Sequence, residues 1–333
     1  MKLESESDVD QLLRAYIPGA ALGAALELGL FWYLEQVPQS ATSIAENFTI
    51  PLTRCQHWLD YLLELGLLEK TPEGYVCSPT AQSAIIEARS KDTWSILAGE
   101  AGERLPAVQN LTANIHEQGS VWAKLELKPP DYAAKLNANP EHARQFTRML
   151  YELHQAESQE LAEKLDLSDV QQLLDIGGGS GVMSYPLLRR YPQLNVVVFD
   201  QANVCKAGRE IAIDLGLEDR IRFLPGNFLE DELPVGIDLI LESDVGIYTD
   251  QLFKKFWAAL KPAGRLVILD YSFETEAASR LQLAGRQFFH SLENPEYSFE
   301  TVNDLKTMLA HAGFRRFSGS IPIGTGLYFE SWK

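Results

Sequence analysis

Leu173-Leu174-Asp175-Ile176-Gly177-Gly178-Gly179-Ser180-Gly181 joins an apolar run directly to a run of glycines. This pattern predicts a buried strand, a tight turn and the start of a helix. Glycine suits such a turn because it accepts a positive φ and has no Cβ that would block a ligand. Residues 182–191 then favour a helix, with Pro186 tolerated near its first turn.

A second apolar run, residues 194–199, ends in Asp200. A carboxylate about 20 residues beyond a glycine turn can hydrogen-bond a ribose diol. A dinucleotide site would favour Gly-x-Gly-x-x-Gly and a phosphate at the helix N-terminus, but here Asp175 places negative charge close to that position. The charge suits a cationic amino-acid cofactor, and S-adenosylmethionine (SAM) fits, with its ammonium, sulfonium, ribose and adenine. The alternative is an ordinary strand–helix turn.

The length, composition and net charge of the chain limit which classes of protein it can belong to. The chain has 333 residues, of which 46% are hydrophobic, and a formal net charge of −17; this charge argues against nucleic acid and anionic membranes as partners. Three separated cysteines and scattered histidines predict reduced thiols and no metal site. The acidic start resembles no signal peptide, and no apolar run reaches the roughly 18 residues of a membrane helix. We therefore expect a cytoplasmic protein.

The first part of the chain predicts a winged helix. Helical patterns cover residues 9–36, punctuated by Pro18 and Gly29, then 42–47 and 52–65, and a hairpin follows at 67–70 and 75–77. A DNA-binding role is the first hypothesis for such a domain. Residues 1–90 hold five basic residues against twelve acids, so phosphate binding is disfavoured. We expect this domain to pack against a second copy of itself.

The rest of the chain predicts an α/β fold. Residues 92–165 are mostly helical, with a loop at Lys128-Pro129-Pro130. Strands and helices then alternate, which indicates a doubly wound parallel sheet. The expected strands are 172–176, 195–199, 221–224, 237–241, 265–269, 314–321 and 326–332, and the expected helices are 182–191, 203–215, 250–260 and 299–312. The expected domains are a winged helix (1–100), a helical linker that contributes to a substrate pocket (101–165) and a SAM-binding domain (166–333).

Four motifs resemble the SAM-dependent O-methyltransferases of the plant caffeate and acetylserotonin type, which also occur in bacteria. They are residues 173–181, Val-Phe-Asp at 198–200, Pro-Gly-Asn-Phe at 225–228 and Leu-Lys-Pro-Ala-Gly-Arg-Leu at 260–266. Residues 27–31 and 62–68 are similar to the dimerisation domain of that family. The resemblance covers nearly the whole chain. It implies a Rossmann-like class I methyltransferase, a homodimer, SAM as the cofactor and a small aromatic or secondary-metabolite acceptor.

The resemblance also assigns roles to single residues. The cofactor set is Asp175, Gly177 and Gly179 for the methionine part, Asp200 for the ribose hydroxyls, Asn227 and Phe228 for adenine, Ser243 nearby, and Gln201 beside Asp200. Asn227 stands where the family has an aspartate, and its carbonyl oxygen can still accept a hydrogen bond from adenine. Phe228 is alternatively a core aromatic. Phe146 and Met149 match a substrate-packing Phe-x-x-Met, although their spacing also fits a core helix, and Phe289 lies in the substrate-lining segment.

The family carries a histidine base in a segment that reads here Ser243-Asp244-Val245-Gly246-Ile247-Tyr248-Thr249-Asp250, without histidine. Three explanations are open. The acceptor arrives ionised, or its nucleophile is an electron-rich carbon, or Tyr248, His290 or His154 is the base. Since tyrosine has a pKa near 10, we expect Tyr248 to orient the acceptor. A short similarity to bacteriochlorophyllide carbon methyltransferases keeps C-methylation open, and SAM binding with other chemistry is a further alternative.

Overall fold

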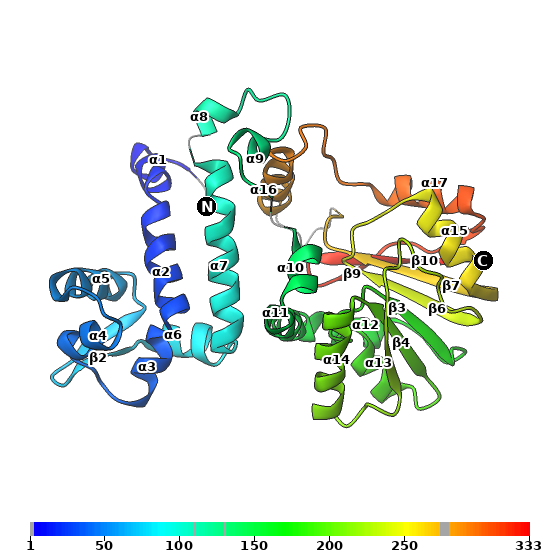
Figure 1. The fold of residues 1–333 in the computed structure, drawn as a ribbon, viewed down its shortest axis with the longest axis horizontal. Coiled ribbons are helices and arrows are strands. Elements are labelled where there is room, and N and C mark those ends of the chain that lie inside the picture. Colours follow the sequence, from blue (N-terminus) through cyan, green and yellow to red (C-terminus); the bar gives the residue numbers. More distant parts are fainter. Residues whose placement is uncertain (1–2, 110, 130, 274–279) are drawn as a thin grey trace. The chain divides into compact units, whose positions relative to one another are not determined.

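The computed structural model describes residues 3–109, 111–129, 131–273 and 280–333, and it divides into two compact units after Val108. The boundary expected at residue 100 falls inside a helix, α7 (Lys91–Val108). Each unit has its own hydrophobic core and its own sheet (Figure 1).

The first unit contains the expected helices and hairpin. Its core holds Ala25, Leu30, Phe31, Leu59 and Leu62, all fully buried. The elements before α7 are α1 (Glu6–Leu13), α2 (Tyr16–Leu28), α3 (Leu30–Gln36), α4 (Ala41–Asn47), α5 (Leu52–Glu64), antiparallel β1 (Leu68–Thr71) and β2 (Gly74–Cys77), α6 (Pro79–Ala81) and the π-helical turn η1 (Gln82–Ile86).

The breaks in the predicted 9–36 helix are only partly where we expected them. Gly29 has a φ of 78° and separates α2 from α3, as predicted. Pro18 does not interrupt the chain, because it is the third residue of α2, where its missing N–H costs no helical hydrogen bond. The first break lies instead at Arg14 and Ala15. No single described helix is long and apolar enough to cross a membrane; α2 and α3 together meet that length and composition but are bent by 60°.

Five helices open the second unit. They are α8 (Leu111–Asn114), α9 (Val121–Lys124), α10 (Tyr132–Ala138), α11 (Pro140–Leu153) and α12 (Gln155–Lys164). Lys128 and Pro129 lie between α9 and α10 as predicted, and Pro130 is outside the described residues. Two ion pairs tie α11 to α14 (Ala202–Asp214): Arg144 to Glu210 at 2.7 Å and Arg148 to Asp214 at 2.9 Å.

The main sheet has the order β5-β4-β3-β6-β7-β10-β8, with β9 paired to β10. Strands β3 to β7 are parallel, and β10 runs antiparallel to β7, so the sheet is mixed. The strands are β3 (Gln172–Ile176), β4 (Asn195–Asp200), β5 (Ile221–Pro225), β6 (Ile237–Ser243), β7 (Leu260–Asp270), β8 (Arg316–Phe317), β9 (Ile321–Ile323) and β10 (Gly326–Trp332). The single strand expected at 314–321 was therefore wrong: β8 and β9 pair with opposite ends of β10.

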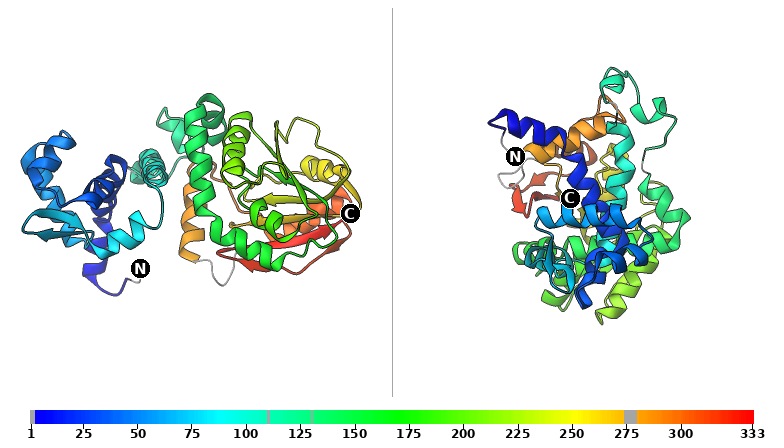
Figure 2. Two further views of the ribbon diagram at one scale, coloured as in Figure 1. Left: turned by 90° about the horizontal axis from the view of Figure 1, so that it is seen from below. Right: turned by 90° about the vertical axis from the view of Figure 1, so that its left-hand side faces the viewer.

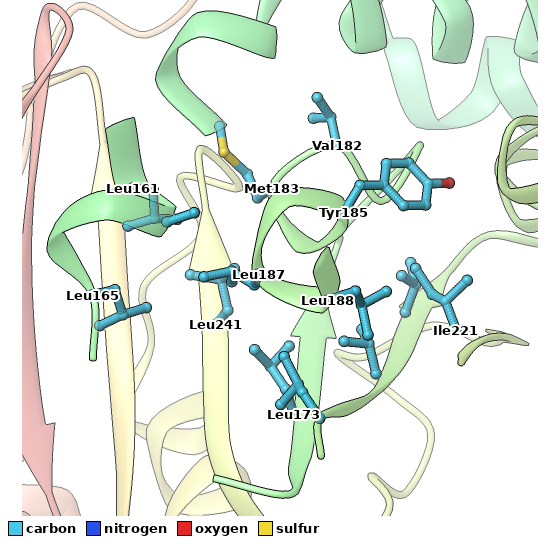
Figure 3. Close-up of a cluster of buried hydrophobic side chains, with 14 of the residues drawn as sticks. Leu161, Leu165, Leu173, Val182, Met183, Tyr185, Leu187, Leu188, Ile221 and Leu241 are labelled. Carbon is cyan, nitrogen blue, oxygen red and sulfur yellow. The ribbon is translucent and has the colours of Figure 1, made fainter. Parts of the chain in front are cut away.

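Helices cover both faces of this sheet, as the ribbon shows from two further sides (Figure 2). Alternate strand residues point to opposite faces: Leu173 and Leu241 pack with α12, α13 (Ser184–Arg190) and α14, and Figure 3 shows Leu187 of α13 beside Leu241. Leu174 and Ile240 pack on the other face with α15 (Asp250–Ala259) and α17 (Val302–Ala312).

The strand order reverses at β3, since the chain moves outward through β4 and β5 and then returns to β6 on the other side of β3. Open α/β sheets bind ligands beside such a reversal, at the carboxyl ends of the strands. The glycine turn and the acids that end β4 and β7 lie at this edge.

Candidate active site

The glycine turn is held open by backbone conformations that suit glycine. Gly177, Gly179 and Gly181 have φ values of 61°, 56° and 81°. A Cβ at Gly177 would lie 2.6 Å from Cγ2 of Val245, so no side chain fits there. A Cβ at Gly179 would meet nothing closer than the Gly177 carbonyl oxygen at 3.9 Å. The turn therefore presents open backbone at Gly179, as the approach of a cofactor requires.

Asp175 lies beneath this turn and is fully buried. The hydroxyl of Ser184 donates a hydrogen bond of 2.6 Å to its Oδ2, and a Cβ at Gly178 would lie 2.4 Å from its carboxyl carbon. Burial raises the pKa of Asp175 to about 7, the Ser184 hydrogen bond opposes the shift, and the charge of Asp200 adds to it. Its observed contacts support the turn, and a contact with the methionine part of SAM stays a prediction.

Asp200 ends β4 and ties it to the glycine turn. Its Oδ2 accepts the Gly179 N–H at 2.9 Å, and its Oδ1 accepts the Gln201 N–H at 2.6 Å. Burial raises the pKa of Asp200, and these two hydrogen bonds oppose the shift. Among the described residues, the buried Oε1 of Gln201 has no hydrogen-bond partner. A carboxylate beside an unpartnered acceptor fits the hydroxyls of a ribose.

The turn after β5 carries the two residues expected at adenine. Asn227 is exposed, and its Oδ1 accepts the Leu229 N–H at 3.1 Å. One lone pair of the side-chain oxygen that we expected to accept from adenine is thus engaged by Leu229; the second can still accept a hydrogen bond, and the amide N–H₂ can donate one. Phe228 is half-buried against the α15 face of the sheet, with its ring 3.8 Å from a Cβ built at Gly177. Phe228 is therefore both part of the core and next to the glycine turn.

Strands β6 and β7 bring two buried acids to the other side of this edge. Glu242 and Asp270 are each 1% exposed. The Val245 N–H donates to Oε1 of Glu242 at 2.9 Å, and the Ser272 N–H donates to Oδ1 of Asp270 at 2.6 Å. Burial, and then the charge of Asp270, raise the pKa of Glu242 well above its usual range.

Tyr248 donates its hydroxyl hydrogen to Oδ2 of Asp270. Its ring stacks on Phe253 of α15 with centroids 6.2 Å apart. Burial raises the pKa of Tyr248 far above 10, and the charges of Glu242 and Asp270 add to the shift. The hydroxyl is therefore protonated at neutral pH, as the sequence led us to expect, and can still accept a hydrogen bond through its oxygen lone pairs.

Ser243 is the last residue of β6 and lies opposite Leu269 of β7. The next residue, Asp244, has a φ of 56°, in the left-handed region, and its N–H donates to the Leu269 carbonyl at 2.8 Å. The Asp244 side chain is exposed. Although the residue is exposed, the surrounding protein displaces part of the water around the carboxyl; this desolvation, and then the charge of Asp270, raise the pKa of Asp244 to about 7, while Arg286 opposes the shift.

The candidate substrate residues fall into two aromatic groups of the second unit. Phe146 and Met149 both lie on α11. The ring centroids of Phe146 and Tyr132 are 5.8 Å apart, and Met149 is buried. On α16 (Arg280–Ser291), the ring of Phe289 lies edge-on to Trp122 of α9 at 6.3 Å.

The two candidate histidine bases occupy different places. His290 of α16 stacks on Tyr297 with centroids 4.7 Å apart and lies edge-on to Phe299 at 6.3 Å. His154, between α11 and α12, lies 5.6 Å from the Tyr271 ring. Within the described ranges, no group of three or more His, Cys, Asp or Glu residues is arranged to hold a metal ion.

The sequence reasoning missed Asp270, Glu242, Asp244 and Trp122. Asp270 gave a usable signal, because an apolar strand that ends in an acid is the same pattern as at Asp200. Asp244 stood in the segment without histidine but was passed over because its unusual φ and its neighbours on β7 are not visible in the sequence.

Comparisons with known proteins agree with this geometry. Residues 110–315 match the model of the O-methyltransferase domain. N,N-dimethyltransferase OxyT of Streptomyces rimosus is 28% identical over 92% of this chain and 89% of its own length. L-tyrosine C(3)-methyltransferase of Streptomyces lavendulae is 30% identical over 75% of this chain and 70% of its own. Human N-acetylserotonin methyltransferase, solved in complex with SAM, superposes with a TM-score of 0.78 at 19% identity, covering 100% of this chain and 99% of that one.

Proposed function

This chain belongs to the O-methyltransferase family and is a SAM-dependent methyltransferase, and from that premise we propose that it methylates an oxygen of a small aromatic or secondary-metabolite acceptor without a histidine base. The observation that carries the proposal is the edge of the sheet at β3, β4 and β6. There the open turn at Gly179 and the carboxylate of Asp200 fit SAM, and the segment 243–250 contains no histidine.

When bound, SAM supplies a methyl group on a good leaving group, the sulfonium. We propose that Asp200 and Gln201 receive the ribose hydroxyls, that Phe228 packs on adenine and that the amide of Asn227 donates to an adenine ring nitrogen. Asp175 keeps the turn in place through Ser184. The remaining catalysis is then the positioning of the acceptor, which turns an encounter of two molecules into one held geometry.

Calorimetry of the purified protein tests the cofactor part of this proposal. We expect saturable binding of SAM and of S-adenosylhomocysteine (SAH) with one site per chain. Absence of SAM binding by the wild-type protein would reject the proposal. Release of SAH from SAM in the presence of a small-molecule cell extract, with a metabolite that gains about 14 Da, would identify the acceptor.

We propose that the acceptor lies against Phe146, Met149 and Phe289, with Trp122 supporting Phe289. Tyr248, fixed by Asp270, would orient its nucleophile. C-methylation is a second candidate, because an L-tyrosine C(3)-methyltransferase is 30% identical to this chain and an electron-rich carbon attacks before it loses its proton. The position of the new methyl group in the product, read by NMR, separates the two candidates.

We propose that the first unit forms a homodimer. Its junction of α1 and α2 exposes Leu12, Leu13, Tyr16 and Ile17 by 46%, 71%, 70% and 42%, and adjoining exposed apolar residues mark interfaces. Light scattering should give twice the chain mass of 37.3 kDa, and a Leu13→Asp, Tyr16→Asp variant should give a monomer. A wild-type protein of one chain mass would contradict the proposal.

We also propose a cytoplasmic location, supported by three free cysteines, Cys55, Cys77 and Cys205, in the described part of the chain. Fractionation of the source cells tests it, and recovery of the protein in the membrane or secreted fraction would contradict it.

A further inference from the structure

The roles proposed so far include no residue that removes the proton from the acceptor hydroxyl, which O-methylation requires. A hydroxyl that holds its proton at working pH needs a base within hydrogen-bond reach. An acceptor that arrives as an anion would avoid this need, but it would approach Glu242, Asp244 and Asp270 at the ends of β6 and β7, whose carboxylates repel it when ionised.

Most acidic or basic groups at this edge have their lone pairs engaged or buried. Both oxygens of Asp270 accept hydrogen bonds, from Tyr248 and Ser272, and its side chain is 1% exposed. Glu242 is buried to the same degree and caps the Val245 N–H. Tyr248 donates its hydroxyl hydrogen to Asp270, and its pKa is raised so far that the hydroxyl stays protonated.

Asp244 differs from these groups in each respect. Its side chain is exposed, and among the residues that the structure describes none forms a hydrogen bond or ion pair with its carboxylate. Its backbone is fixed, because the N–H bonds to Leu269 on β7 while φ takes the left-handed value of 56°. Aspartate tolerates the left-handed region better than most residues do, and here this backbone fixes a carboxylate without a described partner within the segment where the family carries its histidine.

The charges around Asp244 come from several elements. Asp270 of β7 and Glu242 of β6 are acids, Tyr248 and Tyr271 are tyrosines on the adjoining loops, and Arg286 of α16 is the opposing cation. Desolvation by the surrounding protein, and then the charge of Asp270, raise the pKa of Asp244 to about 7, and the charge of Arg286 opposes the shift. A base is most effective when its pKa lies near the operating pH, so this environment makes an aspartate comparable to the missing histidine.

We propose that Asp244 is the general base of the reaction, an inference that rests on the proposed function. The acceptor O–H bond breaks and its proton passes to a carboxylate oxygen of Asp244. An electron pair on the acceptor oxygen forms the bond to the methyl carbon of SAM. The bond between that carbon and sulfur breaks, its electron pair passes to sulfur, and SAH leaves as a neutral thioether. Asp244 then returns its proton to solvent.

Asp244→Asn removes the base and keeps the backbone, because asparagine accepts the left-handed region as aspartate does. The probes are catechol, protonated at neutral pH, and 4-nitrocatechol, largely ionised there. With catechol, kcat should fall at least about 10²-fold, the lower range for a positioned base, and the loss should shrink toward high pH as catechol ionises. With 4-nitrocatechol kcat should change little, and the KM for SAM should be unchanged with both. Asp250→Asn, the same charge change in the same exposed segment, is the control and should be silent.

An equal loss with both catechols, or no loss with either, would overturn the proposal. A second measurement needs no acceptor: ¹³C-carboxyl NMR of the SAH-bound protein, with Asp244→Asn to assign the resonance, should show a titration near pH 7. A midpoint near the ordinary aspartate value of about 4 would also overturn it. Failure of SAH to bind would instead reject the proposed function, so the two failures are distinguishable.

Discussion

At the carboxyl ends of β3 and β4, each acid accepts a hydrogen bond from the glycine turn or from the helix that follows it, whereas at the ends of β6 and β7 one acid has no described hydrogen-bond partner. Ser184 holds Asp175, and the N–H groups of Gly179 and Gln201 hold Asp200. On the other side Asp270 is held in the same manner by Tyr248 and Ser272, but Asp244 beside it is exposed with its carboxylate free of described partners.

Under the proposed function, this contrast separates cofactor binding from chemistry along one edge of the sheet. The acids proposed for the cofactor are fixed in position by hydrogen bonds from the Ser184 hydroxyl and from the N–H groups of Gly179 and Gln201. A group that must take up and release a proton has to keep a lone pair open to the acceptor. Both sides therefore use aspartate, but Asp200 accepts hydrogen bonds from the protein, whereas the carboxylate of Asp244 accepts none from the described residues.

The largest expected effect concerns Asp175 and tests how deeply the cofactor side is buried. A pKa raised from 3.8 to about 7 in the folded protein means that the unfolded chain loses its proton first as the pH rises. The contribution of Asp175 to stability is thus fully present below pH 4 and is lost as the pH rises through 7. At about 1.4 kcal/mol per pKa unit, this amounts to about 4 kcal/mol.

Asp175→Asn removes this titration while keeping the size of the side chain. Urea unfolding of the cofactor-free protein at pH 5 and pH 8 should show wild-type stability falling with pH by more than the stability of the variant. Glu218→Gln, an exposed acid at the opposite end of the sheet, should follow the wild type. Parallel pH dependences of wild type and Asp175→Asn would show that Asp175 is not buried as a neutral acid.

The cofactor side was predictable because its signals are local. The apolar run before Gly177 and the spacing to Asp200 are visible in the sequence, and the strand, the turn and the acid follow from backbone geometry alone. Strand β10 pairs antiparallel with β7 and divides its other edge between β8 and β9, which no local pattern specifies. That pairing is why the single strand at 314–321 was a wrong prediction.

The acceptor side was only partly predictable because its contacts join distant segments. Tyr248 was singled out, but its partner Asp270 is 22 residues away on the next strand. Asp244 stands in the segment that lacks the histidine, yet its left-handed backbone and its hydrogen bond to the Leu269 carbonyl on β7 are properties of the fold. A missing histidine is visible in a sequence, whereas the group that replaces it requires the fold.

The second prediction tests whether the Tyr248 hydroxyl orients the acceptor. Tyr248→Phe keeps the ring against Phe253 and removes the hydroxyl. We expect kcat to fall about 10²-fold, the lower range for a positioned acid–base group, while SAM affinity in calorimetry is unchanged, because Tyr248 contacts Asp270 rather than the glycine turn.

His290→Ala is the control for a rival base on α16. Its stacking on Tyr297 predicts a structural role, so we expect kcat to remain close to wild type. Full activity in Tyr248→Phe combined with an inactive His290→Ala would reject the role of Tyr248 and assign a histidine base to that helix.

The smallest expected effect is on the cofactor side. Asp200→Ala removes the acceptor of two backbone N–H groups and of the ribose hydroxyl that we propose it binds, and hydrogen bonds to a charged group contribute about 1.5–3 kcal/mol. SAM should therefore bind roughly 10- to 150-fold more weakly in calorimetry, since 1.4 kcal/mol is a factor of ten. SAH has the same ribose but no sulfonium charge, so its affinity should fall by the same factor. A loss confined to SAM would mean that Asp200 acts on the cofactor's positive charge instead of its ribose, and the division between a binding side and a chemical side would then have to be redrawn.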